Sequence, residues 1–465
     1  MLKIGVGPSS SHTLGPWKAA QAWNASLAEN LTQVKRVRVE LFGSLSLTGK
    51  GHATDIAVIL GLLDADPVSF DTNSINETIE IIRTFKRLAL SGSHNIDFDP
   101  DKDIRFNNSF RAEHANAMSF KAYFLNGETS ESFYYSLGGG FIADQTQINQ
   151  ENKDDDTLRA LKYPINNASE LLKHCKLENC SISDLVGENE LNWRDKEIID
   201  RDIDAIWRVM LQAMFDGCHT QGILPGGLEV KRRAFKTHQK LIKTTEEYTL
   251  DSWIPTIRST EVKFREILKW VSCFALSVNE VNASLGRVVT APTNGSAGVI
   301  PAVLMYYMVI ENHQANFEHI KRFLFVAGEI GCIFKKNATI SAAMGGCQAE
   351  IGVSSAMAAA GLCELLGGSP EQVTSAAEIA MEHHLGMTCD PIGGLVQVPC
   401  IERNSMGAIK AIHAAEIALE NDEDQARVSL DEVISTMWKT AQDMHTNYKE
   451  TAKGGLAISV SQADC

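Results

Sequence analysis

Polar and hydrophobic positions alternate over residues 34–43, VKRVRVELFG, where valine and leucine are separated by charged side chains. Alternation of this kind predicts a half-buried β-strand. Residues 95–141 likewise predict short strands separated by turns. Apolar residues recur at helical spacing over 17–31, 56–63 and 75–92. Strands and helices mixed in this way predict an α+β domain over residues 1–147.

The pattern changes after a polar, charged stretch, TQINQENKDDDT. Because this composition is typical of solvated connections, we predict a linker over residues 148–160. Beyond it, apolar residues recur every three or four positions in nearly every segment. Residues 161–465 are therefore predicted to form a mainly α-helical domain. Helical patterns within it cover 166–186, 204–219, 260–284, 355–385, 402–420 and 428–449.

The helical pattern is interrupted at residues 386–400, GMTCDPIGGLVQVPC. Its prolines fix the backbone, and its glycines open conformations that other residues avoid, so we predict a shaped loop. Cys389 and Cys400 bracket this loop. A third cysteine, Cys347, lies in a similar glycine-rich setting, AAMGGCQAE, and the chain ends on Cys465.

These cysteines indicate an iron–sulfur site with three fixed protein ligands, Cys347, Cys389 and Cys400. Their spacing is not the compact C-x-x-C-x-x-C run, and a buried cysteine is more often a small hydrophobic residue than a ligand, so spacing alone leaves both interpretations open. A terminal cysteine is usually frayed. In GGLAISVSQADC, however, apolar residues alternate after a glycine pair. We therefore expect the chain end to pack back and bring Cys465 toward the interior.

Composition narrows the class of protein. The 465 residues include 43 Lys and Arg against 58 Asp and Glu, a formal net charge of −15, which disfavours a surface for nucleic acid or anionic membrane. No apolar stretch reaches the roughly 18 residues that a membrane span requires, and the start lacks the apolar core of a secretory signal. Ten cysteines in so long a chain do not indicate a disulfide scaffold. We predict a cytoplasmic protein whose thiols stay reduced.

A polar loop at residues 5–16, GVGPSSSHTLGP, gathers Ser9, Ser10, His12 and Thr13 ahead of a helix. Such residues commonly cap a helix N-terminus. They could equally form a hydrogen-bonding cradle for a small anion. The residues alone favour the cap.

The turn GKGH places Lys50 and His52 between a predicted strand and a predicted helix. Histidine titrates near neutrality, so His52 is a candidate general base, although it could also be a first-turn residue without chemistry. Lys50 has the pattern of a solvated charge. Further candidates for polar contacts, in turns where a structural role is about as frequent, are Ser136, Thr293, Asn294 and Ser296.

Taken together, these stretches closely resemble the bacterial iron–sulfur L-serine dehydratases, which work without pyridoxal phosphate, in their single-chain form. The motifs that carry the resemblance span nearly the whole chain in order: GPSSSHTLGP, GSLSLTGKGHATDIA, YYSLGGGFI, RVVTAPTNGSAGVIPAVL, GCQAEIGV, GMTCDPIGGLVQVPCIERN and GGLAISVSQADC. Few residues precede GPSSSHT, so an N-terminal segment is expected to be missing from this sequence.

The resemblance implies a [4Fe–4S] cluster, conversion of L-serine to pyruvate and ammonia, and a homodimer. The family's cluster cysteines fall on Cys347, Cys389 and Cys400. Its C-terminal cysteine, which occupies the open iron when substrate is absent, falls on Cys465. We expect His52 to be the base, with Lys50 in reserve. The residues expected to hold the substrate are Ser9, Ser10, His12, Thr13, Ser136, Thr293, Asn294 and Ser296.

Two other classes of function are considered. A pyridoxal phosphate dehydratase would use TNGSAG as its phosphate cup and needs a Schiff-base lysine, which no feature of the sequence singles out. A structural zinc site or a redox sensor would have full sulfur ligation and no open position.

Overall fold

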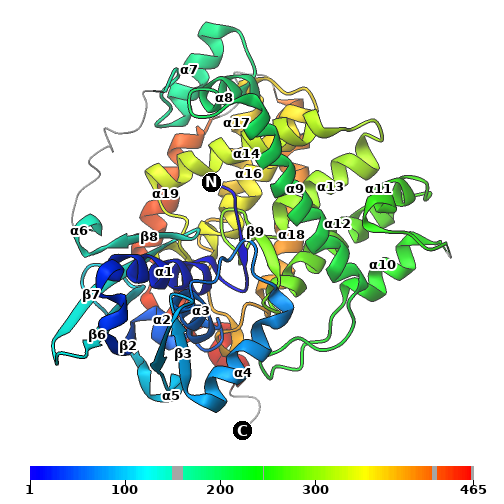
Figure 1. The fold of residues 1–465 in the computed structure, drawn as a ribbon. Helices are drawn as coiled ribbons and strands as arrows, with labels where there is room; N and C mark the ends of the chain where they lie inside the picture. The colour runs from blue at the N-terminus through cyan, green and yellow to red at the C-terminus, as the bar shows by residue number, and fades with distance from the viewer. Residues whose placement is uncertain (149–160, 245, 422–426, 462–465) are drawn as a thin grey trace.

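The computed structural model of the protein describes residues 1–148, 161–244, 246–421 and 427–461. An α/β region comes first and a mostly helical region follows, as predicted (Figure 1). The predicted linker lies, beyond residue 148, outside the described residues.

A five-stranded sheet organises the N-terminal region, with strand order β5-β2-β6-β7-β8. Strands β2 and β5 are parallel, and the other neighbours are antiparallel. The strands are β5 (Ile104–Asn107), β2 (Val34–Phe42), β6 (Ala117–Phe124), β7 (Thr129–Gly138) and β8 (Phe141–Asp144). A separate hairpin joins β3 (Arg87–Leu90) to β4 (His94–Asp97).

Helices pack on this sheet through buried aromatic side chains. Trp23 of α1 stacks on Phe120 of β6 with ring centroids 5.4 Å apart. The helices of this region are α1 (Gly15–Leu27), α2 (Ser44–Leu47), α3 (Thr54–Leu62), α4 (Ile75–Phe85), α5 (Pro100–Asp103) and α6 (Gln145–Ile148). The sheet therefore carries the loops before α1 and before α3, where the candidate polar residues lie.

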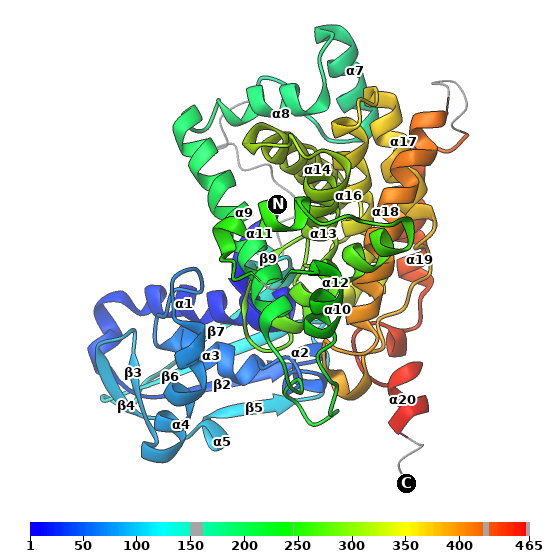
Figure 2. The ribbon, with the colours of Figure 1, turned by 90° about the vertical axis from the view of Figure 1, so that its right-hand side faces the viewer.

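Helix α16 (Ile351–Leu365) forms the centre of the second region and packs against α14, α17 and α18 (Figures 1 and 2). Nearly all of its residues are buried, as expected for a helix that is apolar on every side. The other helices are α7 (Ala168–Glu178), α8 (Ile182–Glu190), α9 (Lys196–His219), α10 (Ala234–Ile242), α11 (Leu250–Arg258), α12 (Phe264–Asn282), α13 (Val299–Tyr306), α14 (Phe317–Asn337), α15 (Ala342–Gly345), α17 (Pro370–Glu382), α18 (Cys400–Glu420), α19 (Leu430–Asp443) and α20 (Leu456–Ser461).

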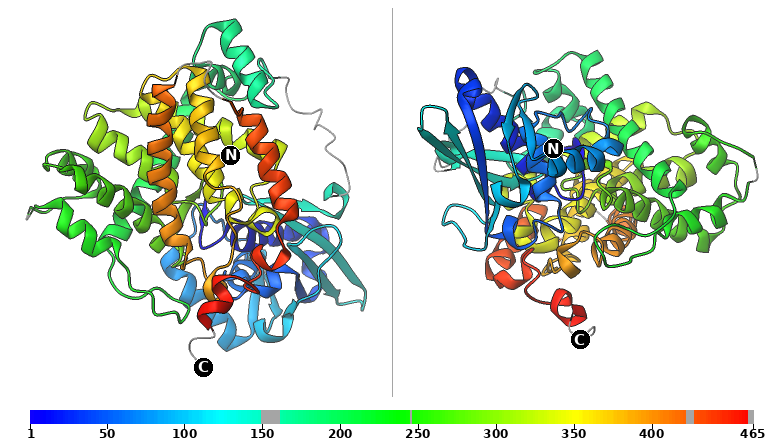
Figure 3. Two further views of the ribbon diagram at one scale, coloured as in Figure 1. Left: turned by 180° about the vertical axis from the view of Figure 1, so that it is seen from behind. Right: turned by 60° about the horizontal axis from the view of Figure 1, so that its bottom comes forward.

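The two regions exchange chain segments at their boundary. Strand β1 (Lys3–Val6) pairs with β9 (Arg287–Thr290), which follows α12 of the helical region. At the other end of the sequence, the segment after α19 returns to the N-terminal region, as the red chain beside the blue helices shows (Figure 3). Segments near both ends of the described chain thus contribute to the boundary.

Three local predictions are wrong in whole or in part. The helix predicted over 75–92 ends at Phe85, because Lys86 adopts a left-handed conformation and β3 begins at Arg87. The run predicted over 355–385 is divided between α16 and α17, with Gly367 at a φ of 93° in between. The third prediction is wrong only in part. The tail does return to the cysteine loop, where Leu456 N donates to Asp390, but its apolar residues form the short helix α20 and Leu456, Ile458 and Val460 are about 40% exposed.

Candidate active site

Three cysteines converge at the end of the helical region that faces the sheet domain. Cys347 lies in a short turn after α15, Cys389 in the loop after α17, and Cys400 at the first position of α18. All three are buried and form no disulfide. The sulfur atoms of Cys347 and Cys389 and a carboxylate oxygen of Glu350 lie within 4.8 Å of one another.

The loop around these thiols is held by one guanidinium group. Arg403, one turn into α18, donates to Cys347 Sγ at 3.2 Å and to the Thr388 carbonyl at 2.6 Å. It also pairs with Asp390 at 3.1 Å. Asp390 in turn accepts a hydrogen bond from the Leu456 backbone at 2.8 Å. The cysteine loop is therefore tied both to α18 and to the start of α20.

Burial opposes negative charge at this centre. The pKa of Cys389 is raised well above its ordinary value by the neighbouring Cys347 thiol and by burial, and burial and Cys347 likewise raise the pKa of Cys400. Burial alone would lower the pKa of Arg403, but Cys347 and Cys400 raise it overall. Closely spaced buried thiols ionise readily only when a bound cation compensates their charge.

The donor set fits an iron–sulfur cluster. Cluster iron is held by cysteine thiolates. Here the sulfur atoms of Cys347 and Cys389 lie within 4.8 Å of each other, and Cys400 is close enough to Cys347 for their charges to interact. Three sulfur ligands on a four-iron cluster leave one iron without a protein thiolate. This arrangement differs from a closed structural zinc site, which uses four protein ligands.

Two histidines of the N-terminal region lie beside the same centre. His12 and His52 are both fully buried, with ring centroids 4.6 Å apart. One carboxylate oxygen of Glu450, Oε1, is 3.5 Å from His12 Nδ1 and 3.5 Å from His52 Nε2. Glu450 comes from the segment after α19, and its backbone N–H donates to the Cys389 carbonyl at 3.0 Å. Glu450 therefore links the cysteine loop to both histidines.

Hydrogen bonds fix the tautomers of the two rings. His52 Nδ1 lies 2.9 Å from the Thr48 carbonyl and so carries the proton, which leaves Nε2 with a lone pair. The Ser44 hydroxyl donates to the Glu450 carbonyl at 2.9 Å, so it accepts from His12 Nε2 at 3.0 Å. His12 Nδ1 consequently also has a lone pair, which accepts a hydrogen bond from the Ser11 hydroxyl at 2.9 Å and lies 3.5 Å from Glu450 Oε1. The His52 Nε2 lone pair lies at the same distance from that oxygen.

The protonation of this group follows from its burial. Burial, with Glu350 and Cys347 nearby, raises the pKa of Glu450 well above its ordinary value. Burial lowers the pKa of His52 to about 4 and, together with His52, lowers that of His12 well below its ordinary value. Both shifts favour the uncharged forms, and at neutral pH the His52 ring is neutral and able to accept a proton. Glu450 also has a φ of 56°, a strained conformation for a residue other than glycine.

Most of the predicted polar residues are brought together at the domain boundary. Ser10 Oγ accepts a hydrogen bond from the Gly139 backbone at 3.2 Å, and Thr13 Oγ1 donates to the His52 carbonyl at 2.7 Å. Ser9 Oγ accepts from His12 N at 3.1 Å, so this serine does cap the turn, as the residues alone favoured. Ser136 Oγ is buried with no hydrogen-bond partner among the described residues.

The TNGSAG turn contributes a second set of polar groups from the helical region. Thr293, Asn294 and Ser296 are all buried. Thr293 Oγ1 and Ser296 Oγ lie 3.1 Å apart, and Asn294 Nδ2 donates to the Val6 carbonyl at 3.1 Å. Asn294 Oδ1 is buried without a partner in the described chain. Buried polar groups left without a partner are uncommon in folded proteins and mark places where a ligand or water belongs.

The two remaining predicted site residues are Lys50 and Cys465. The Lys50 side chain is exposed, and its ammonium group lies 5.6 Å from the centroid of the Phe106 ring. Cys465 lies outside the described residues.

Three residues of the centre were not predicted from the sequence: Glu350, Arg403 and Glu450. A signal existed for Glu350, since it is the only acidic residue in the otherwise apolar or small run GCQAEIGVSSAMAAAG. Glu450 carried no such signal, because it follows a surface-type helix in a polar stretch. Its role depends on a long-range contact that no local pattern reports.

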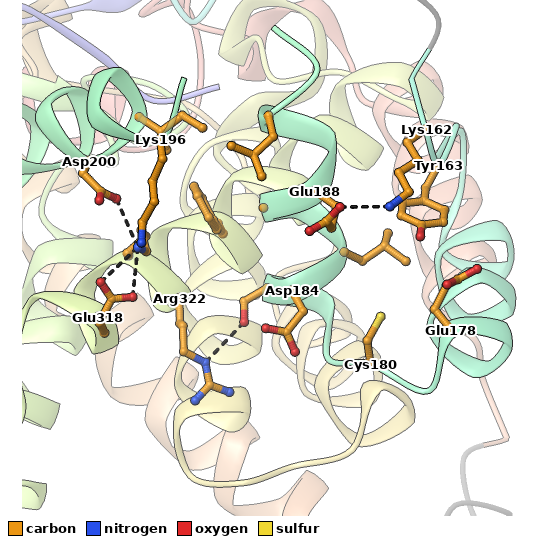
Figure 4. A pocket seen from close by; sticks show the side chains of 17 residues that line it. Lys162, Tyr163, Glu178, Cys180, Asp184, Glu188, Lys196, Asp200, Glu318 and Arg322 are labelled. Atoms are coloured by element: carbon orange, nitrogen blue, oxygen red, sulfur yellow. Dashed lines mark hydrogen bonds and ion pairs between the residues drawn. The ribbon is translucent and has the colours of Figure 1, made fainter. Parts of the chain in front are cut away.

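A different part of the molecule holds a large cavity. It measures about 710 Å³ and is lined by residues of α8, α9 and α14 in the helical region (Figure 4). Its charged groups largely neutralise one another, as with Lys162 and Glu188 at 2.9 Å and Lys321 and Asp200 at 3.1 Å. None of the predicted site residues lines it. Its size therefore does not make it the reaction site.

The fold and site define a two-domain protein in which a buried three-thiol centre meets two histidines across a domain boundary. Residues 1–147 match the family described as serine dehydratase beta chain, and residues 177–457 match serine dehydratase alpha chain. The chain belongs to the serine dehydratase family, in the form that carries both parts in one polypeptide. Among the described residues, no helix has the length and apolar content to cross a membrane.

Named relatives are similar over nearly their whole length. The chain is 46% identical to L-serine dehydratase 1 of Escherichia coli over 464 residues, which covers 99% of this chain and 98% of that protein. It is 47% identical to L-serine dehydratase of Streptomyces coelicolor, with the same coverage. Identity to L-serine dehydratase of Helicobacter pylori strain J99 is 43%, over 98% of this chain and 97% of the relative.

The two regions are in close contact at a pair of glycine turns, and this contact generates a test. A Cβ added to Gly51 of the GKGH turn would lie 2.5 Å from the Gly394 carbonyl oxygen of the cysteine loop. We expect Gly51→Ala to destabilise the protein by about 1–3 kcal/mol, because one of the two backbones must move. The measurement is denaturant unfolding.

The control is Gly328→Ala in α14, where an added Cβ meets no atom within 4 Å. Alanine in an open helical position should leave stability unchanged or raise it by up to about 1 kcal/mol. Equal stability of Gly51→Ala and the parent protein would show that the two turns are not in contact.

Proposed function

We propose that the protein converts L-serine to pyruvate and ammonia with the help of a [4Fe–4S] cluster. The observation that carries this proposal is the meeting of three buried thiols, two neutral histidines and a shared carboxyl group at one domain boundary. The proposal is further supported by the names of relatives that are 43–47% identical over nearly the full chain, all of them L-serine dehydratases.

The reaction has two chemical difficulties, since the α-proton of serine is weakly acidic and hydroxide is a poor leaving group. Cys347, Cys389 and Cys400 would hold the cluster, and the iron without a thiolate would supply Lewis acidity toward the serine hydroxyl. The protein's own residues must then orient the substrate and move the proton. The cluster is not proposed to carry electrons here.

His52 is proposed to accept the α-proton at Nε2. The hydrogen bond from Nδ1 to the Thr48 carbonyl orients the ring and presents the Nε2 lone pair, and the lowered pKa keeps the ring neutral before the reaction. Glu450 Oε1 lies 3.5 Å from that nitrogen, and this carboxyl oxygen would accept a hydrogen bond from the N–H that forms there. Because the Lys50 side chain is exposed, it is the weaker candidate.

The substrate carboxylate is proposed to bind the polar groups of the boundary. Ser136 lies in β7 and Asn294 in the TNGSAG turn, and among the described residues Ser136 Oγ and Asn294 Oδ1 are buried without a hydrogen-bond partner. The Ser136 hydroxyl would donate to the substrate carboxylate, whereas Asn294 Oδ1 is an amide oxygen and would accept a hydrogen bond from an N–H or O–H group of the ligand. The residues proposed to surround the substrate are Ser9, Ser10, His12, Thr13, Ser136, Thr293, Asn294 and Ser296.

The homodimer and the cytoplasmic location expected from the resemblance and the composition stay predictions. Both are compatible with a protein that acts on a small molecule.

The function is tested by comparing the parent protein with His52→Ala after anaerobic purification. We expect the parent to contain iron and sulfide and to form pyruvate from L-serine. The variant should keep its iron and its cluster absorbance but lose at least about a hundredfold in kcat, because a general base typically contributes that much. The measurements are metal and sulfide analysis and a pyruvate assay.

A matched control is His238→Ala, which removes a buried histidine of the helical region that accepts from Trp253 Nε1. Its turnover per iron should equal that of the parent. Near-normal turnover of His52→Ala would remove His52 from the mechanism, whereas an active parent without iron would contradict the proposed function itself.

Cys465 is proposed to compete with serine for the open iron. A tethered thiolate acts at a high effective concentration, so serine must displace it, and saturation becomes delayed or sigmoidal. We expect Cys465→Ser to give a hyperbolic curve with a lower KM and an unchanged iron content. Steady-state kinetics and iron analysis provide the test, with Cys180→Ser, outside the site, as control. Loss of iron in Cys465→Ser would make this residue a structural ligand instead.

A further inference from the structure

Glu350 is the acidic group of the centre that remains open to a ligand. Its side chain is partly exposed, whereas Cys347, Cys389 and Glu450 are buried. It follows the Cys347 turn and immediately precedes α16. One of its carboxylate oxygens lies within 4.8 Å of the sulfur atoms of Cys347 and Cys389. A carboxylate in this position faces any small molecule that approaches the thiol centre.

Arg403, the nearby cation, forms no ion pair with Glu350 in the described structure, although its charge acts on that carboxyl group. Arg403 is engaged by Cys347, the Thr388 carbonyl and Asp390, and Glu350 forms no ion pair within the described part of the chain. Glu450 differs, because its carboxylate is shared between His12 and His52. A largely desolvated carboxylate without a cation is costly, so this position favours a positively charged group on the ligand.

The surroundings of Glu350 suit a small group that donates hydrogen bonds. Gly295 of the TNGSAG turn lies against the carboxylate, and a Cβ there would be 3.1 Å from both oxygens. The Thr293 hydroxyl donates a hydrogen bond to the same carboxylate. Glycine therefore leaves room beside the oxygens, and a threonine hydroxyl adds a second acceptor. An ammonium group has three N–H donors to satisfy and fits such a cleft.

We propose that Glu350 binds the α-ammonium group of the substrate and so selects amino acids over hydroxy acids. This inference rests on the proposed function, which places serine at the same centre. Serine would then be held at its carboxylate by the boundary hydroxyls and at its ammonium group by Glu350. Holding two substituents of Cα fixes the direction of the third, the hydrogen that His52 is to take. A site that forms an ion pair with a charged group of its ligand discriminates against ligands that lack this group.

The test compares Glu350→Gln with the parent protein, using two ligands that lack the leaving hydroxyl. L-alanine carries the ammonium group, and propanoate is the same molecule without it. We expect the KM for L-serine and the inhibition constant of L-alanine to rise at least about 30-fold in the variant, since breaking a desolvated charge pair has effects of this order. The inhibition constant of propanoate should stay unchanged or fall, because a repelling charge is gone.

Direct calorimetric binding of L-alanine and propanoate to the anaerobically purified proteins gives a readout that is independent of turnover. Glu364→Gln is the matched control, since it replaces a buried glutamate at the far end of α16 that accepts hydrogen bonds from Ser183 N. This control should preserve the preference of the parent protein for L-alanine over propanoate.

The results for Glu350→Gln distinguish between the roles that Glu350 could have. An unchanged ratio of the two inhibition constants in Glu350→Gln would overturn the assignment while leaving the proposed function intact. Loss of iron from the variant would also overturn it, because Glu350 would then be a ligand of the metal. Parent protein that binds neither L-serine nor L-alanine would instead count against the proposed function.

Discussion

Burial disfavours negative charge at the centre of this protein, where thiols and carboxyl groups lie close together. The rest of the site compensates for this electrostatic cost. Three thiols and two glutamates lie together, with one guanidinium group among them. In a medium of low dielectric constant, such groups either keep their protons or gain a bound cation. The thiols satisfy this condition by holding a metal cluster, as proposed above. Glu450 satisfies it by favouring its protonated form, since burial raises its pKa well above the ordinary value.

The site forms only where the two regions of the chain meet. The N-terminal sheet positions the turns that carry His12 and His52, and the helical region supplies the thiols and the TNGSAG turn. The segment after α19 closes the arrangement, since Glu450 contacts Ser44 of one region and Cys389 of the other. Neither region contains a complete set of groups for the reaction. The close glycine contact between Gly51 and Gly394 is therefore a requirement for chemistry as much as for stability.

Much of this architecture could be predicted from the sequence. The alternating pattern at 34–43 became β2, and the proline-rich loop with Cys389 and Cys400 is a loop that leads into α18. The pattern predicted too long a helix over 75–92. Apolar residues recur at helical spacing on both sides of Lys86, but Lys86 adopts a left-handed conformation that ends α4 at Phe85. The pattern also failed in part for the tail, whose alternation formed a short exposed helix.

The parts that could not be predicted are long-range contacts. Glu450 lies 398 positions after His52 in the sequence, and no spacing rule connects them. Arg403 has the pattern of an ordinary helical residue, yet it donates to Cys347 and holds the loop. Residue type and local turn chemistry thus predicted which groups could react. Only the folded structure shows which of these groups interact through their charges and hydrogen bonds.

The central claim is that a cluster held by Cys347, Cys389 and Cys400 has one iron free to bind the substrate. Mössbauer spectroscopy of the anaerobically purified, ⁵⁷Fe-loaded protein, with and without L-serine, tests it most directly. The account predicts that a single iron site changes its spectrum when serine is added, while the other sites keep the parameters of thiolate-bound iron. Spectra in which serine alters no iron site, or in which no cluster iron is present in active protein, would contradict it.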